Sequence, residues 1–229
     1  MNQQLTPRGT TAGFSLIELL IAMTTTIAML GLASTLLSAA FRIRGRENAV
    51  SDATADAQRA LNIMSREIAN AGFNLTTNGV VAGDSDASHI RIRSNLNRFD
   101  AFATSASRNG VIDASEDVKY FVNTASGTDY LVRYDANTGS KTVLANRLDS
   151  LRIHYFSQSV TYDTNGTPAC DYSNPSSGEV SPDAARYIVI AICVQLPAFG
   201  VPNSAGYQPA SNVLLVSDVT LRNANLTAY

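Results

Sequence analysis

Residues 14–41 form an unbroken run of apolar, small or hydroxyl side chains with a single charged residue, Glu18. The run is 28 residues long, and an α-helix needs only about 20 residues to cross the hydrocarbon core of a bilayer. A carboxylate inside a span costs about 2.5–3.5 kcal/mol at the bilayer centre and usually marks function. The sequence therefore predicts a membrane-spanning helix in which Glu18 has a specific role.

Two common types of apolar N-terminal segment fit this run incompletely. A plain membrane anchor explains its length but gives Glu18 no purpose. A secretory signal peptide would be cut near Ser38-Ala39-Ala40, which resembles a small-residue cleavage site. However, such peptides carry an apolar region of only about 7–15 residues and a more basic leader.

The residues around the start of the run support a third interpretation. Gly13-Phe14, followed by Ser15-Leu16-Ile17 and Glu18, resembles the processing signal of type IV pilin precursors. The resemblance implies that a prepilin peptidase cleaves after Gly13 and that the new terminal residue, Phe14, is N-methylated. It also implies that Glu18 pairs with the terminal ammonium of an adjacent subunit during assembly.

The chemistry of these positions agrees with that resemblance. Gly13 gives a protease the least hindered backbone. Glu18 lies four residues after Phe14, about one helical turn away, where the helix dipole favours a carboxylate. Pairing a carboxylate with an ammonium in lipid would neutralise two costly charges.

The charges that flank the run conflict with this orientation. Arg42, Arg44 and Arg46 follow it, whereas only Arg8 precedes it. The positive-inside rule alone would place the C-terminal part in the cytoplasm. The processing signal implies the opposite orientation, and we then expect the three arginines to act as interfacial anchors.

The helix is expected to continue through residues 42–73 as an amphipathic segment. Apolar residues recur every three or four positions, and Gly72 is the expected C-cap. This stripe comprises Val50, Ala53, Ala57, Leu61, Met64 and Ile68. We expect it to pack on the chain's own sheet.

From Gly72 onward, short strand-like runs alternate with turn residues, as in an antiparallel sheet. The expected strands are His89–Ser94, Val118–Asn123, Tyr130–Tyr134, Lys141–Leu144, Leu151–Phe156, Tyr187–Leu196 and Val213–Leu221, with a hairpin loop at 135–139. The predicted fold is α+β and pilin-like, with a long N-terminal helix packed on a mostly antiparallel sheet. Its parts are a leader (1–13), a span (14–41), the helix continuation (42–73) and a periplasmic sheet domain (74–229).

Four segments that follow the predicted span narrow the resemblance to particular classes of pilin-like protein. Residues 61–73, 146–155, 186–196 and 219–223 are similar to PilW-type minor pilins and, more loosely, to J-type minor pseudopilins of type II secretion. The resemblance implies a low-copy subunit that helps to prime pilus assembly near the tip. Its partners would be prepilin peptidase, other minor pilins, the major pilin and an inner-membrane assembly platform. Its location would be the inner membrane, with a periplasmic domain, and then the pilus surface.

Other chemistry has little support in the sequence. The two histidines, His89 and His154, lie in strand-like runs, and no zinc, phosphate-binding or dinucleotide motif occurs. We expect no enzyme activity, no cofactor and no metal.

Arg91 and Arg93 are expected on one solvated strand face. With a net charge of −2, the chain is not expected to bind nucleic acid. A membrane-anchored periplasmic binding protein or enzyme remains the alternative from another class.

Cys170 and Cys193 are the only cysteines. If the domain is exported, both face an oxidising compartment, where a disulfide is favoured. The alternative is that Cys193, between Ile192 and Val194, is a buried free thiol that packs as a small apolar side chain.

Overall fold

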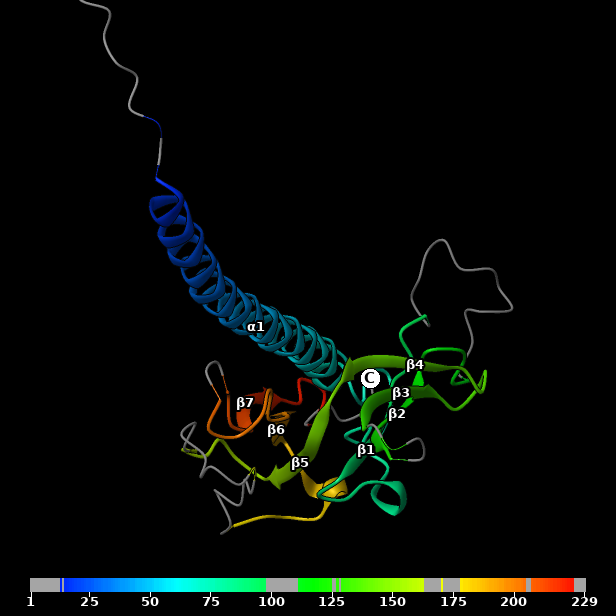
Figure 1. Cartoon of the computed structure of the whole chain (residues 1–229). Helices are drawn as coiled ribbons and strands as arrows, with labels where there is room; N and C mark the ends of the chain where they lie inside the picture. Colours follow the sequence, from blue (N-terminus) through cyan, green and yellow to red (C-terminus); the bar gives the residue numbers. More distant parts are fainter. Residues whose placement is uncertain are drawn as a thin grey trace, which may run out of the picture.

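One helix, α1 (Leu16–Ala69), joins the predicted span to the predicted amphipathic segment without a break. It contains 54 residues and is therefore about 81 Å long at 1.5 Å per residue. The computed structural model describes residues 13, 15–97, 111–124, 127, 129–162, 170, 178–204 and 207–224. The N-terminal half of α1 stands clear of the rest of the chain, and the C-terminal part lies on it (Figure 1).

The packed part of α1 follows the predicted stripe closely. Its buried residues are Ala53, Ala57, Ala60, Leu61, Met64 and Ile68. Val50 is only partly buried, and Ala60 takes a place in the core that the stripe did not include. Three alanines at the contact let the helix backbone approach the strands closely.

The end of α1 differs from the prediction of a Gly72 cap. The helix ends at Ala69, and Asn70 is the C-cap residue. The Nδ2 atom of Asn223 donates to the carbonyl of Ala71 at 3.1 Å, and the Arg222 amide donates to that of Ala69 at 3.2 Å. The amides of Asn70 and Ala71 satisfy the carbonyls of Glu67 and Ile68, so the helix is closed before Gly72. Gly72, with a φ of +77°, turns the chain just after that end.

In the described part of the chain, seven strands follow the helix, and every strand pair is antiparallel. They are β1 (His89–Arg93), β2 (Asp117–Asn123), β3 (Tyr130–Asp135), β4 (Lys141–Asn146), β5 (Leu148–Phe156), β6 (Tyr187–Leu196) and β7 (Ser211–Thr220). Two short 3₁₀ turns, η1 (Ala82–Asp84) and η2 (Pro182–Ala184), precede β1 and β6. All seven predicted strands are confirmed, with ends that move by up to three residues.

The strands form two sheets, whereas the sequence predicted one. The first has the order β1-β2-β3-β4 and the second the order β5-β6-β7. The chain passes from β4 to β5 through Arg147 alone, whose φ is +60°. This left-handed residue turns the chain, so that β5 pairs with β6 instead of continuing beside β4.

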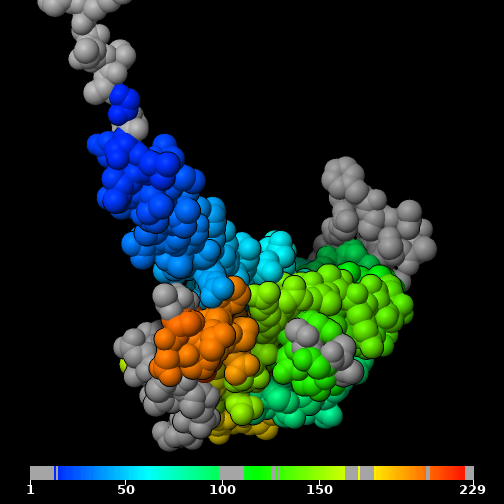
Figure 2. Space-filling view, in the orientation of Figure 1, coloured from blue at the N-terminus to red at the C-terminus, as the bar shows by residue number. Residues whose placement is uncertain are grey.

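The main core lies between α1 and the two sheets. Helix α1 contacts β4, β6 and β7, and the space-filling view shows its cyan part resting on this body (Figure 2). β6 is buried on both faces over most of its length, because a smaller cluster around Phe156 and Val189 covers the side that faces away from the main core.

Candidate functional site

The N-terminal half of α1 exposes a continuous apolar surface. Leu16 is 82% exposed, Leu36 73% and Phe41 63%. The helix is long and apolar enough to cross a membrane, and none of its most apolar window is buried by the rest of the chain. This surface is too large to be left in water and requires a lipid or protein environment.

Glu18 lies at the free end of that helix. Ser15 is the N-cap residue, and its amide donates to Oε2 of Glu18 at 3.4 Å. Both residues are exposed, as is Gly13, where an added Cβ atom would meet nothing within 4 Å. Phe14 lies outside the described residues. The carboxylate is thus accessible, and its hydrogen bond to Ser15 is long. It can therefore also bind a cationic partner.

The three arginines after the span do not share one environment. Arg42 and Arg44 are exposed. Arg46 instead reaches the segment before β7, where its Nη2 atom donates to the carbonyl of Pro209 at 2.5 Å and to the Ser211 hydroxyl at 3.0 Å. Arg46 therefore has a contact within the chain, in addition to the expected role of an interfacial anchor.

A polar contact also holds the C-terminal end of α1 on the first sheet. Nε of Arg133 lies 3.0 Å from Oε2 of Glu67, and the Tyr120 hydroxyl donates to the same oxygen. Burial, reinforced by the negative charge of Glu67, raises the pKa of Tyr120. The phenol therefore stays protonated and can keep donating.

Arg91 and Arg93 are not a solvated pair, as the sequence had indicated. Arg91 binds Asp117 through two hydrogen bonds of 2.7 and 2.9 Å, and Nε of Arg93 donates to the same carboxylate at 2.8 Å. The Asp117 side chain is only 7% exposed. Burial opposes its ionisation, but the two guanidinium groups outweigh burial and lower the pKa of Asp117.

We expect Asp117→Asn to lower the free energy of unfolding at neutral pH by about 2–3 kcal/mol, because two arginines lose their buried anion. The pKa of Asp117 is lower in the folded protein than in the unfolded one. The carboxylate therefore makes its full contribution to the free energy of unfolding above the unfolded pKa of about 3.9, and this contribution disappears as the pH falls through the folded pKa. Urea unfolding of both proteins across acidic and neutral pH measures this difference.

Asp56→Asn is the control, because it removes an exposed ion pair with Arg59. It should change the free energy of unfolding by less than about 1 kcal/mol. A difference that persists undiminished in acid would contradict the role of the Asp117 charge.

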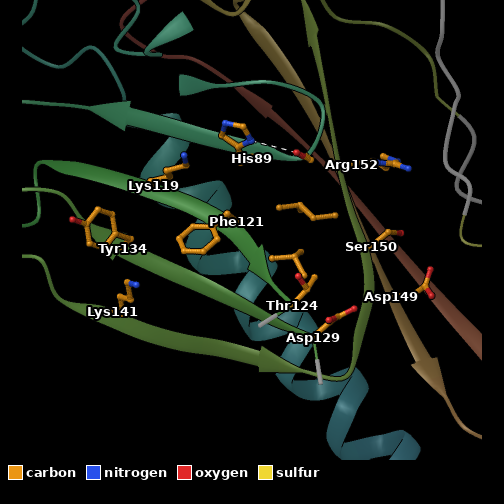
Figure 3. A pocket seen from close by; sticks show the side chains of 13 residues that line it. His89, Lys119, Phe121, Thr124, Asp129, Tyr134, Lys141, Asp149, Ser150 and Arg152 are labelled. Carbon is orange, nitrogen blue, oxygen red and sulfur yellow. Dashed lines mark hydrogen bonds between the residues drawn. The ribbon is translucent and has the colours of Figure 1, made fainter. Parts of the chain in front are cut away.

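A groove of about 710 Å³ opens between the first sheet and β5. Its lining contains Phe121 and Tyr134, each with a lysine ammonium about 6 Å from its ring centre, together with Asp129, Asp149 and Arg152 (Figure 3). The groove combines apolar surface with charges of both signs and is large enough for a small molecule or a short peptide.

His89, at one end of the groove, does not form a Ser-His-Asp triad with its neighbours. Its Nδ1 atom lies 2.9 Å from Oδ1 of Asp86 and 3.2 Å from the Ser88 hydroxyl. The Ser88 hydroxyl donates a hydrogen bond to Oδ1 of Asp86, at 2.8 Å. Asp84 lies on the other side of the ring, with its Oδ1 atom 3.6 Å from Nε2 of His89. A triad requires the serine to donate its proton to the imidazole, whereas Ser88 donates to Asp86, so this cluster is a turn stabilised by Asp86.

The structure contains a disulfide between Cys170 and Cys193, whose Cα atoms are 5.5 Å apart. It ties a residue of the segment between β5 and β6 to β6 itself. Asp149 approaches the two sulfur atoms, within 4.8 Å. The disulfide removes the thiolates that a soft metal ion would need there.

No protein-family model, curated protein or solved structure matches the chain. Its function therefore has to be inferred from the residues and their placement.

Proposed function

We propose that this chain is a minor pilin of a type IV pilus, a low-copy subunit that helps to prime assembly near the tip. The observation that carries the proposal is the exposed, apolar half of α1, which begins three residues after Gly13 and carries the exposed Glu18 carboxylate in its first turn. A filament of packed helices would bury this surface, and a bilayer would hold it before assembly.

The proposed maturation uses three residues. Prepilin peptidase cuts after Gly13, Phe14 becomes the N-methylated terminus, and Glu18 binds the terminal ammonium of a neighbouring subunit. Among the described residues, an accessible Glu18 that accepts only the Ser15 amide supports the last step. Other minor pilins, the major pilin and the inner-membrane assembly platform are the proposed partners, and we assign the chain no enzymatic activity.

Surface filaments from a deletion strain test this function. We expect filaments to be absent without the gene, restored by the natural chain and not restored by Gly13→Val, because the β-branched residue crowds the scissile bond. Mass spectrometry of the restored protein should find Phe14 as a methylated N-terminus and should find the Gly13→Val chain uncut. Normal filaments in the deletion strain would contradict a pilus role and would favour a J-type pseudopilin, for which secreted proteins would then be measured.

The groove of Figure 3 favours one alternative, a membrane-anchored periplasmic binding protein. Such a protein would use α1 only as an anchor and the groove as its working site. It would keep residues 1–13, so the same N-terminal mass measurement separates the two functions. A terminus at Phe14 supports the pilin, and an uncut terminus together with normal filaments supports the binding protein.

A further inference from the structure

A second hollow, of about 480 Å³, lies where α1 leaves the body of the protein. Gly45, Arg46 and Ala49 of α1 form one side, and the opposite side comes from the β4–β5 junction and the end of β6. The remaining lining residues are Gly127, Asp129, Arg147, Leu148, Gln195, Leu196, Pro197 and Phe199. We call this hollow the arginine pocket.

Two guanidinium groups of the pocket lack a carboxylate partner among the described residues. Nη1 of Arg46 is buried and has no hydrogen-bond partner in this part of the chain, and a buried donor without an acceptor costs about 1–3 kcal/mol. Arg147 is held in a left-handed backbone conformation that strains a non-glycine residue. Asp129 is the carboxylate in the lining, yet neither arginine forms an ion pair with a described residue. The pocket therefore favours an anion.

The position of the pocket along α1 indicates which anion. Arg46 follows Phe41, the last residue of the apolar run, by five positions, or about 7.5 Å of helix. The headgroup layer on each side of a bilayer is about 5–8 Å thick. When 14–41 spans the membrane, Arg46 lies at headgroup level.

The loop that forms the pocket's outer rim is apolar and exposed. Phe199 is 45% exposed and Val201 67% exposed, and the Arg46 contact to Pro209 and Ser211 holds the C-terminal end of this segment near the helix. Figure 2 shows the orange surface, which includes β7, directly against the light-blue part of α1. An apolar rim beside paired cations matches a lipid, which offers acyl chains and a phosphate together.

We propose that the arginine pocket binds the phosphate headgroup of an anionic phospholipid, with Arg46 and Arg147 as its ligands and Phe199 against the glycerol and acyl region. This proposal depends on α1 spanning the membrane, which belongs to the proposed function. Lipid binding at this place would fix the tilt of the body relative to the bilayer before the subunit leaves the membrane.

Native mass spectrometry of the full-length chain in detergent, titrated with phosphatidylglycerol, tests the proposal. Arg46→Gln combined with Arg147→Gln should weaken lipid binding about tenfold or more, because the loss of one or two charge-assisted hydrogen bonds changes the affinity by about this factor. The matched control, Arg42→Gln combined with Arg44→Gln, removes two equally charged, exposed residues outside the pocket. It should change binding less than about twofold. Equal losses in the two double variants would overturn the proposal, because charge alone would then explain binding.

Gly45→Leu tests the pocket without a change of charge. A Cβ atom at Gly45 would meet nothing within 4 Å, so the leucine fits the helix and extends into the hollow. We expect about tenfold weaker phosphatidylglycerol binding, since the headgroup loses its space. Unchanged binding would overturn the proposal, as would displacement of the lipid by inorganic phosphate.

Incorporation into phosphatidylcholine vesicles separates this inference from the proposed function. All variants retain residues 14–41 and should incorporate as the natural chain does. A natural chain that fails to incorporate would overturn the membrane span and, with it, both proposals. Incorporation without preferential retention of phosphatidylglycerol would overturn the lipid site alone.

Discussion

The Gly79→Ala variant is expected to lose about 3–4 kcal/mol or more of unfolding free energy, a large share of the 5–15 kcal/mol that stabilises an ordinary domain. Gly79 has a φ of +80°, and an added Cβ atom would lie 2.0 Å from the Gly72 nitrogen and 2.5 Å from the Arg93 carbonyl oxygen. Every one of these neighbours is backbone, so none can rotate away. The clash falls where the end of α1 meets β1.

Two other glycines provide controls for that measurement. Gly139 has a φ of +71° with open space around it, so Gly139→Ala reports the backbone strain alone, about 1–2 kcal/mol. Gly83 has neither a positive φ nor a close neighbour, so Gly83→Ala should stay within about 0.5 kcal/mol. Urea unfolding in detergent, followed by tyrosine circular dichroism, measures all three. A Gly79→Ala loss no larger than that of Gly139→Ala would contradict the steric explanation.

Glu18→Ala is expected to reduce incorporation of the chain into filaments at least about tenfold while its folded body keeps its stability. In the proposed assembly, the variant leaves a neighbour's ammonium unpaired in an apolar surrounding, and an uncompensated buried charge costs about 3–5 kcal/mol. Within the part of the subunit that the structure describes, Glu18 accepts only the Ser15 amide at 3.4 Å, at an exposed helix end. Quantitative immunoblots of sheared filaments against whole cells measure the incorporated fraction.

Glu47→Ala is the matched control for the assembly experiment. Glu47 is an exposed glutamate of the same helix, beyond the apolar run. Its removal should leave incorporation within about twofold of the natural chain. Equal incorporation of Glu18→Ala and the natural chain would exclude Glu18 from subunit pairing. An equal thermal stability of both variants would show that any defect arises in assembly and not in folding.

The candidate N-terminal site could be predicted from residues alone because its information is local. The length of the apolar run, the glycine before it and the carboxylate within it are fixed by sequence spacing. The groove of Figure 3 and the arginine pocket could not be predicted in this way. Arg46 and Arg147 are about a hundred positions apart and line the same hollow only after α1 docks across the junction of the two sheets.

The sequence alone determined the helix and all seven strands, because periods of 3.6 and 2 are properties of neighbouring residues. The tertiary structure decided how those elements pair, where they end and which side chains contact each other. The Arg147 backbone divides one expected sheet into two, the Asn223 side chain donates to the carbonyl of Asn70, 153 positions earlier in the chain, and Asp117 binds Arg91 and Arg93. The contacts of Asn223 and Asp117 join groups that are not neighbours in sequence, and they exist because burial requires polar atoms to find partners, wherever in the chain these partners are encoded.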